Sequence, residues 1–332
     1  DAMNQKYSHA KAINAIATGI RGNWDDRREV IAKSPSMVGV LRQAARAAQS
    51  DASVLLLGES GTGKEIVAQY IHQHSPYRKK QMVAINCTSL PESLLEAELF
   101  GYEKGAFTGA ASGGKIGLIE AAANNTLLLD EVNSMPLSLQ AKLLRVLETK
   151  AVIPVGSVKP RAVNFRLICA SNVALAQCVK EGTFRMDLYY RLNVIPITIP
   201  PLRERREDIT PLADYFLDHF CQKYGLQKEF SSRVYQILNH YKWPGNIREL
   251  RNLVEHMVVM SESSVVKINQ IPTGMLQLEP PSPESGPECL NEEYLRIQMA
   301  LRLHGGHREK TAQYLGISRR TLQYKLKKYG LL

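Results

Sequence analysis

The stretch Gly58-Glu-Ser-Gly-Thr-Gly-Lys64 constrains the fold of this 332-residue chain more than any other segment. It follows an aliphatic run that ends at Leu57 and precedes apolar residues at helical spacing. Glycines in such a loop let backbone N–H groups surround a phosphate at the start of a helix, and the lysine reaches the terminal phosphates. The stretch therefore predicts a nucleotide-binding loop between a strand and a helix. The candidate ATP-binding residues here are Gly58, Glu59, Ser60, Gly61, Thr62, Gly63, Lys64 and Glu65.

The ligands for a magnesium ion must come from an unusual set of residues. The residue after the lysine is usually Ser or Thr, whose hydroxyl holds Mg²⁺, whereas here it is Glu65. The apolar run Leu127-Leu-Leu129 ends in Asp130 and Glu131. We expect Asp130 to hold Mg²⁺, directly or through water, and Glu131 to orient and deprotonate the attacking water. Such an acidic pair is common after apolar strands, and it gains weight here from the phosphate loop that precedes it.

Short aliphatic runs alternate with amphipathic segments between residues 36 and 200. This alternation predicts an α/β fold in which crossover helices join parallel strands. The predicted strands cover residues 53–57, 82–86, 126–129, 165–170 and 194–199. Pro200 and Pro201 close the region, because proline neither continues a strand nor enters the interior of a helix.

The rest of the chain divides by composition. Residues 207–277 are helical in pattern and predict a smaller lobe, and four prolines within residues 279–289 predict an extended linker. Apolar residues at helical spacing predict a helix over residues 9–21. We therefore predict an N-terminal linker helix within 1–30, an α/β subdomain over 31–200, a helical lid over 201–278, a linker over 279–289 and a C-terminal domain over 290–332.

The hexapeptide Gly105-Ala-Phe-Thr-Gly-Ala110 places one large aromatic residue among small ones. It could form a glycine-rich hairpin whose Phe107 packs into the core, or a mobile loop that presents Phe107 and Thr108 to a partner. Together with the preceding Glu98-Leu-Phe-Gly101, it resembles the contact loop of the bacterial enhancer-binding activators of sigma-54 RNA polymerase, which are AAA+ P-loop ATPases. The residues that the resemblance assigns to the sigma-54 contact are Gly105, Ala106, Phe107, Thr108, Gly109 and Ala110.

The resemblance implies roles for further residues around the nucleotide. Those activators commonly carry Glu at the position of Glu65, and an Asn at the position of Asn86 holds their catalytic glutamate inactive until ATP binds. Ser171 and Asn172 end a predicted strand, where such ATPases carry a polar sensor of the γ-phosphate. The alternative for Asn86 is a buried side chain that only satisfies the end of a strand.

Three arginines also match the family pattern. In Phe184-Arg185-Met-Asp-Leu-Tyr-Tyr-Arg191, the two arginines correspond to the pair that reaches the ATP of the adjacent subunit. An arginine there stabilises charge in the transition state. Arg248 in Trp243-Pro-Gly-Asn-Ile-Arg248 resembles the second sensor, which reports the nucleotide state to the lid. Because the paired arginines act in a neighbouring subunit, the resemblance implies a ring, most simply a hexamer; surface ion pairing is the alternative.

The net charge of +10 is concentrated near the C-terminus, where residues 290–332 hold nine Lys or Arg and three acidic residues. A basic domain of this size indicates a polyanionic partner such as DNA. The pattern predicts helices around Leu295–Leu303, over 308–315 and over 319–328, in helix-turn-helix order. This resembles the Fis-type domain of the same activators; a three-helix protein-binding module is the alternative. The candidate DNA-binding residues are Ser318, Arg319, Arg320, Gln323 and Lys327.

The cysteine content and the length of the apolar runs indicate the cellular compartment. Five scattered cysteines, an odd number without metal-ligand spacing, favour free thiols in a reducing cytoplasm. No apolar run approaches the roughly 20 residues that span a bilayer, so we expect a soluble protein with no membrane partner. The chain starts at Asp1 rather than at a methionine, which leaves room for an upstream regulatory domain.

Together these features predict an ATP- and Mg²⁺-dependent transcription activator. As the resemblance implies, its dimeric tail would bind double-stranded enhancer DNA, and its ring would remodel the closed complex of sigma-54 and RNA polymerase. One rival is a different ring ATPase, such as an unfoldase or a helicase loader. Another is a DNA-binding repressor whose ATPase fold serves as an oligomerisation switch.

Overall fold

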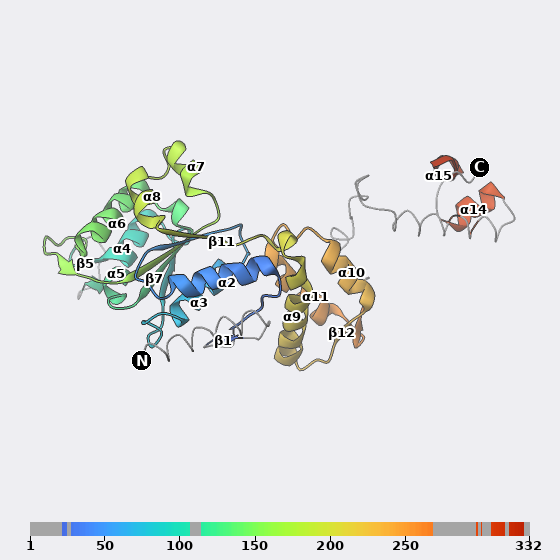
Figure 1. Ribbon diagram of the computed structural model, residues 1–332, viewed down its shortest axis with the longest axis horizontal. Coiled ribbons are helices and arrows are strands. Elements are labelled where there is room, and N and C mark those ends of the chain that lie inside the picture. The colour runs from blue at the N-terminus through green and yellow to red at the C-terminus, as the bar shows by residue number, and fades with distance from the viewer. Residues whose placement is uncertain are drawn as a thin grey trace. The chain divides into compact units, whose positions relative to one another are not determined.

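Five parallel strands form the central sheet in the order β11-β3-β10-β7-β4 (Figure 1). The strands are β3 (Val54–Leu57), β4 (Val83–Asn86), β7 (Thr126–Asp130), β10 (Arg166–Ser171) and β11 (Ile195–Thr198). All five predicted strands are confirmed, each within one residue at either end, and every neighbouring pair is parallel. The α/β fold predicted from the alternation of aliphatic and amphipathic segments is therefore confirmed.

The computed structural model describes residues 22–24, 28–106, 114–267, 297, 300, 307–315 and 319–328. The chain separates into two units, Asp1–Pro272 and Thr273–Leu332. The predicted helix over residues 9–21 and the predicted linker over residues 279–289 lie outside the described residues. Strands β1 (Gly22–Trp24) and β2 (Arg28–Val30) pair antiparallel ahead of the first described helix, and the sequence did not predict them.

Helices cover both faces of the sheet, so residues along each strand alternate between two cores. Leu55, Leu127 and Leu167 belong to one buried cluster, whereas Leu56 and Leu128 belong to the other. This alternation follows from the two-residue period of a strand, and burial on both faces explains why the strands are almost entirely apolar. The helices of this unit around the sheet are α2 (Pro35–Ala47), α3 (Lys64–Gln73), α4 (Glu92–Phe100), α5 (Leu118–Ala121), α6 (Leu137–Thr149), α7 (Leu175–Lys180) and α8 (Met186–Leu192).

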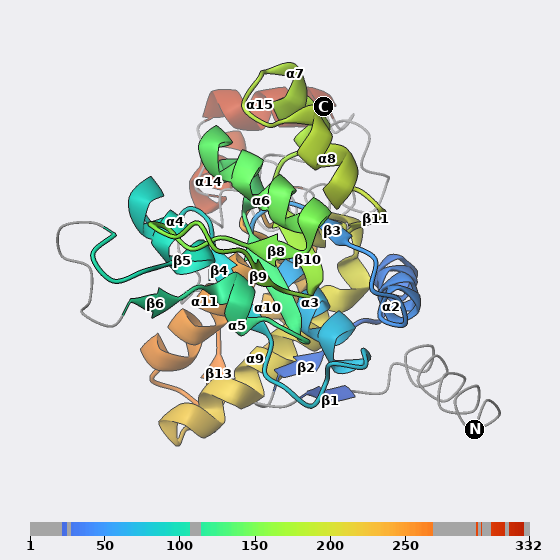
Figure 2. The same cartoon turned by 90° about the vertical axis from the view of Figure 1, so that its left-hand side faces the viewer.

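Two small antiparallel pairs extend from the edge of this subdomain near α4. Strands β5 (Gly101–Tyr102) and β6 (Lys115–Ile116) form one pair, and β8 (Ala151–Val152) and β9 (Arg161–Ala162) form the other (Figure 2). The backbone N–H of Glu103 donates to the carbonyl of Val155 at 2.9 Å, which ties the two pairs together. The base of the β5–β6 pair is therefore anchored to the segment between β8 and β9.

A helical lobe follows the sheet, as predicted. Short 3₁₀ turns η2 (Leu202–Glu204) and η3 (Arg206–Asp208) lead into α9 (Ile209–Tyr224), α10 (Ser232–His240) and α11 (Asn246–Met260). The pattern did not predict the parallel pair β12 (Glu229–Phe230) and β13 (Val265–Val266), because two-residue strands leave no periodic signal. Trp243 is fully buried in this lobe, and its indole N–H donates to the carbonyl of Leu238 at 2.8 Å.

The second unit contains α14 (Arg308–Tyr314) and α15 (Arg319–Lys328), close to two of the three helices predicted there. Most of the first predicted helix, around Leu295–Leu303, lies outside the described residues. Ile297, Ala312, Leu322 and Leu326 form its small core. Ser318, a candidate DNA-binding residue, lies outside the described residues. Helix α15 buries Leu322 and Leu326, which are four residues apart and so share one face of the helix.

Among the described residues, no helix is long and apolar enough to cross a membrane. Cys87, Cys169, Cys178 and Cys221 are free thiols, in keeping with the prediction, and Cys289 lies outside the described residues.

Candidate nucleotide site

The polar ends of four strands meet at the carboxyl edge of the sheet. Strand β3 leads into Gly58, β4 ends at Asn86, β7 ends at Asp130 and β10 ends at Ser171. Asn86 is the register partner of Asp130, and Ser171 is that of Leu57. Ligands of open α/β sheets bind outside this edge, so the topology brings the predicted phosphate loop and acidic pair to one place.

The phosphate loop joins β3 to α3 with a backbone that only glycine adopts easily. Gly61 and Gly63 have φ angles of 77° and 98°. A Cβ atom on Gly61 would lie 2.4 Å from the carbonyl oxygen of Gly245, so the loop also approaches the lid closely. Helix α3 begins at Lys64, which places its free N–H groups at the loop, as phosphate binding requires.

Lys64 is buried at the base of the loop. Its Nζ donates to the carbonyl oxygens of Gly58 at 2.8 Å and Glu59 at 3.0 Å. Burial lowers the pKa of Lys64, and the nearby carboxylates of Asp130 and Glu131 oppose that shift. The ammonium group is thus held where phosphate oxygens can replace the two carbonyls.

Asp130 has the surroundings of a ligand for a hard cation. Burial raises the pKa of its carboxyl, whereas the backbone N–H of Glu131 and the charge of Lys64 lower it. That N–H donates to Oδ1 at 2.9 Å, and Oδ2 has a long contact of 3.5 Å from Nδ2 of Asn86. In the described part of the chain, no group of three or more His, Cys, Asp or Glu side chains could hold a metal alone. One carboxylate nevertheless fits Mg²⁺, which commonly takes its other ligands from phosphate and water.

Thr88 stands between the two residues of the predicted switch. Its hydroxyl lies 2.7 Å from Oε2 of Glu131 and 2.5 Å from Oδ1 of Asn86, and its backbone N–H donates to the same Oδ1 at 2.8 Å. Asn86 therefore reaches Glu131 through Thr88 in the contacts of this structure, rather than by a direct hydrogen bond. Glu131 has a φ angle of 51°, which turns the chain sharply where β7 ends.

The two predicted sensor residues differ in their partners. The hydroxyl of Ser171 is buried and has two acceptors for its one proton, the carbonyl of Val173 at 2.7 Å and Oδ1 of Asn133 at 3.0 Å. Asn172 has a buried Oδ1 without a hydrogen-bond partner among the described residues. An unpaired buried amide oxygen is costly, so Asn172 is the residue of the two with capacity for an added ligand.

The arginine pair lies on α8, with Arg185 at its start and Arg191 near its end. Both side chains are exposed. Arg185 forms a two-pronged ion pair with Asp187, through Nε at 3.0 Å and Nη2 at 2.7 Å. Arg191 donates to the carbonyl of Leu147 at 3.2 Å. The structure thus presents both arginines at the surface of α8.

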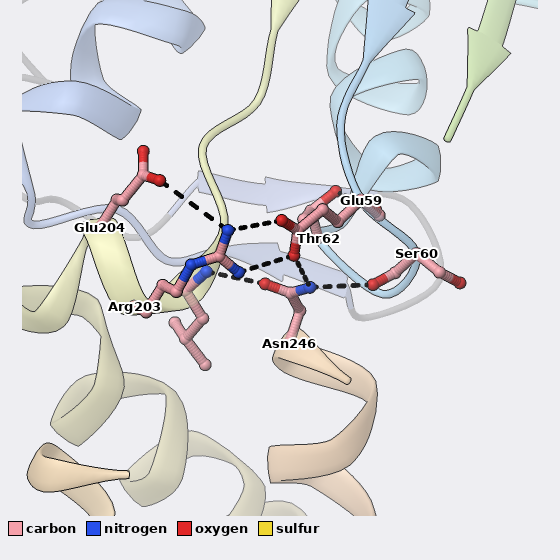
Figure 3. Close-up of polar contacts among 7 residues, drawn as sticks. Glu59, Ser60, Thr62, Arg203, Glu204 and Asn246 are labelled. Carbon is pink, nitrogen blue, oxygen red and sulfur yellow. Dashed lines mark hydrogen bonds and ion pairs between the residues drawn. The ribbon is translucent and has the colours of Figure 1, made fainter. Parts of the chain in front are cut away.

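Arg248 reaches the phosphate loop from the lid. Its Nη1 donates to the hydroxyl of Ser60 at 2.9 Å, and the N–H of the preceding Ile247 donates to the carbonyl of Gly61 at 2.9 Å. Figure 3 shows a further group beside it, in which Glu59, Arg203 and Asn246 point toward one another. The start of α11 therefore lies against the phosphate loop, as expected for a residue that senses the nucleotide.

The loop that resembles the sigma-54 contact is carried by β5 and β6. Gly105 and Ala106 are described, and Gly105 has a φ angle of 75°; a Cβ atom on Gly105 would meet no atom of the described residues within 4 Å. The remaining contact residues, Phe107 to Ala110, lie outside the described residues, so the two interpretations of Phe107 stay predictions. In the second unit, Arg319 and Gln323 are exposed on α15. Arg319 forms an ion pair with Glu309 at 3.0 Å.

Sequence reasoning missed Thr88, Arg203 and Asn246. Asn246 lies inside the motif Trp243–Arg248 that was already singled out, and Thr88 follows the predicted switch residue Asn86 by two positions. Arg203 lies 144 residues from its partner Glu59 and carries no local signal.

Family models match three consecutive parts of the chain. Residues 30–198 match the Sigma-54 interaction domain, residues 203–287 the AAA+ ATPase lid domain, and residues 291–329 the Bacterial regulatory protein, Fis family. The chain thus belongs to the sigma-54 interaction family of AAA+ ATPases. The fold class and the resemblance predicted from the sequence are confirmed.

Individual relatives agree with this assignment. The chain is 43% identical to the regulatory protein AtoC of Escherichia coli (strain K12), over 98% of this chain and 73% of that protein. It is 46% identical to UacR of the same organism, over 88% of this chain but 52% of that protein. The chain therefore spans about half to three quarters of these relatives.

Solved structures of NtrX from Brucella abortus share the fold. The structure of NtrX in complex with ADP has a TM-score of 0.70 and 28% identity, over 99% of this chain and 74% of that one. NtrX in complex with ATP has a TM-score of 0.68.

Proposed function

We propose that this chain hydrolyses ATP to remodel closed complexes of sigma-54 RNA polymerase, while its C-terminal domain binds enhancer DNA. The domain limits given above divide it into the parts that perform these tasks. The match to the Sigma-54 interaction domain and the ATP and ADP complexes of NtrX support this function. Because polymerase and DNA are its partners, the protein would work in the cytoplasm.

The observation that carries the proposal is where the contact loop is attached. The chain runs from β4 through α4 into the β5–β6 pair and then through α5 into β7. Strands β4 and β7 are neighbours, and their last residues, Asn86 and Asp130, are register partners. A shift of β4 relative to β7, caused by nucleotide at the carboxyl edge, would therefore act on both ends of the loop, through α4 from the end of β4 and through α5 from the start of β7.

The residues of the carboxyl edge suit hydrolysis of ATP. The loop 58–63 and Lys64 would bind the phosphates, and Asp130 would hold Mg²⁺, which neutralises charge on the phosphates when bound. Glu131 would take a proton from the attacking water. The Asn86–Thr88–Glu131 contacts would hold that carboxylate away from the water until the γ-phosphate arrives, and Ser171 and Asn172 would sense that phosphate.

The two arginines of α8 suit a ring, most simply a hexamer. Both are exposed, and Arg185 is held by a neighbour two residues along its own chain. We propose that a second copy packs against α8 and that Arg185 and Arg191 then reach its ATP. Charge that develops on the transferring phosphate would be stabilised from outside the subunit that binds it.

The second unit suits duplex DNA. Helix α15 buries Leu322 and Leu326 and exposes Arg319 and Gln323. Arginine and glutamine at the start of such a helix can contact base edges in the major groove. We propose that two copies bind an enhancer-like site through this helix, with Ser318, Arg320 and Lys327 as further contacts.

A substitution in the contact loop tests the proposal. Thr108→Ala should abolish open-complex formation at a sigma-54 promoter and leave ATP hydrolysis largely intact, because Thr108 is not among the residues proposed to bind or hydrolyse the nucleotide. A repressor that uses its ATPase fold only to assemble would keep repression in this variant. Open-complex formation at the unaltered level would contradict the proposal.

A pull-down separates this function from other ring ATPases. The unaltered chain should retain purified sigma-54 in the presence of an ATP transition-state mimic, and the Thr108→Ala variant should not. No retention of sigma-54 by the unaltered chain would point to a rival ring ATPase that uses the loop for another substrate, and equal retention by the unaltered chain and the variant would remove Thr108 from the contact.

A further inference from the structure

We propose that Glu59, Arg203 and Asn246 form a latch between the phosphate loop and the lid, so that nucleotide in the loop sets the position of the lid. The latch deepens the proposed function and rests on the assignment of residues 58–64 as the nucleotide site. Arg203 and Asn246 are positioning residues in this proposal.

The ion pair of the latch is two-pronged. Arg203 on η2 donates through Nη1 to Oε2 of Glu59 at 2.8 Å and through Nη2 to Oε1 at 2.6 Å (Figure 3). This pairing fixes the orientation as well as the distance of both side chains. The Arg203 guanidinium, together with the Asn246 amide, holds the pKa of Glu59 at about 2. The negative charge of Glu59, which lies in the phosphate loop, is thereby balanced by the positive charge of Arg203 from the lid.

Asn246 joins three segments of the chain. Its Nδ2 donates to Oε2 of Glu59 at 3.1 Å and to the carbonyl of Ser60 at 3.0 Å. Its Oδ1 accepts from the backbone N–H of Leu202 at 2.8 Å. The residue is fully buried and has a φ angle of 53°, a conformation that Asn tolerates better than most residues. The amide therefore connects the loop, η2 and the start of α11.

Further hydrogen bonds connect residues 60–62 of the phosphate loop to the same two lid segments. Arg205 is buried and donates to the carbonyl of Thr62 at 2.6 Å. Gly61 accepts from the N–H of Ile247, and Arg248 binds Ser60. Residues 59–62 are thus each held by the segment 202–205 or by the start of α11. A change of loop shape on phosphate binding must move those segments or break these contacts.

Exposure argues that the ion pair has a role other than folding. The side chains of Arg203 and Glu59 are 39% and 43% exposed, and ion pairs at such positions contribute little to stability. A latch predicts that their removal alters the response to nucleotide far more than the thermal midpoint. A purely structural contact predicts the reverse.

Hydrogen exchange and calorimetry on the full chain test the latch. In the unaltered chain, ADP should slow amide exchange both in residues 58–65 and in residues 245–250. In Arg203→Gln, ADP should still protect the loop, but protection of residues 245–250 should be clearly weaker than in the unaltered chain, and ADP affinity should fall by about tenfold, a typical coupling. The thermal midpoint should stay within about 2 °C of the unaltered chain, as expected for an exposed pair.

Exchanging the charges of Glu59 and Arg203 tests whether the ion pair itself couples the loop to the lid. The double variant Glu59→Arg with Arg203→Glu should recover most of the lost protection, whereas each single variant should not. Lys223→Gln, which breaks an exposed pair with Glu255 elsewhere in the lid, is the matched control and should respond to ADP as the unaltered chain does.

The outcomes separate the latch from the site assignment. If ADP did not protect residues 58–65 of the unaltered chain but protected another segment, the assignment of the nucleotide site would be wrong. Normal protection of residues 245–250 in Arg203→Gln, with the loop still protected, would overturn the latch alone.

Discussion

The carboxyl edge of the sheet and the surface of α8 differ in how far a single copy of the chain completes them. At the edge, Lys64, Glu131 and Asn86 each contact side chains or carbonyls of other segments. On α8, Arg185 is exposed and pairs with Asp187, which is close in sequence. In the proposed ring, the carboxyl edge would be the inner half of the ATP site, organised within one subunit, and the exposed arginines of α8 would be the outer half, which serves a second copy.

Glu131→Gln gives the largest expected effect and tests the inner half. The amide keeps the shape of the side chain but cannot accept the proton from water, so ATP turnover should fall by about 10⁴-fold with ATP binding retained. Steady-state hydrolysis and calorimetry on the same preparation measure both. Hydrolysis at the unaltered rate would remove Glu131 from its proposed role.

Arg185→Ala tests the outer half, with an expected fall in turnover of about 10³-fold. Because we propose that the arginine serves the neighbouring subunit, adding this variant to the unaltered chain should lower total activity by more than its share of the mixture. A strictly proportional loss would show that Arg185 acts within its own subunit, and would break the comparison.

Thr88→Val tests whether the Thr88 hydroxyl restrains Glu131 within the subunit. The Thr88 hydroxyl has one proton and two acceptors, Asn86 and Glu131, so its donation to the carboxylate restrains the proposed base. Its removal should raise basal ATP turnover by up to about tenfold, the value of one hydrogen bond to a charged group. Thr88→Ser should behave like the unaltered chain, and a fall in turnover in Thr88→Val would argue against a restraint.

Asp187→Asn should have the smallest effect. The pair with Arg185 is exposed, so its loss frees the guanidinium at little cost, and turnover at saturating protein should change by less than about threefold. ATP turnover is measured over a range of protein concentrations. A loss of turnover as large as that of Arg185→Ala would show that Asp187 itself takes part in the chemistry.

The sequence predicted the parts of the molecule whose signals are local. All five core strands contain runs of aliphatic residues, the lid has a helical pattern over a long segment, and the phosphate loop has its own spacing. The β1–β2 and β12–β13 pairs are two or three residues long, too short for a periodic signal. Arg203 and Glu59 come into contact only when the chain folds, so no spacing in the sequence could reveal their ion pair.

Within the candidate site, backbone position was predictable and side-chain partnership was not. Asn86 and Asp130 were both placed at strand ends, and the register confirms that they are neighbours. The Thr88 hydroxyl that links this pair to Glu131 depends on the turn after β4 and on the φ angle of Glu131. These are features of the folded chain.

Mixing two inactive variants tests the central claim most directly, namely that each ATP site is completed by a second copy of the chain. Glu131→Gln subunits keep Arg185, and Arg185→Ala subunits keep Glu131, so some interfaces in the mixture hold both groups. We predict that ATP hydrolysis reappears when the two variants are combined, well above the sum of their separate rates. A mixture as inactive as its components would contradict the shared site.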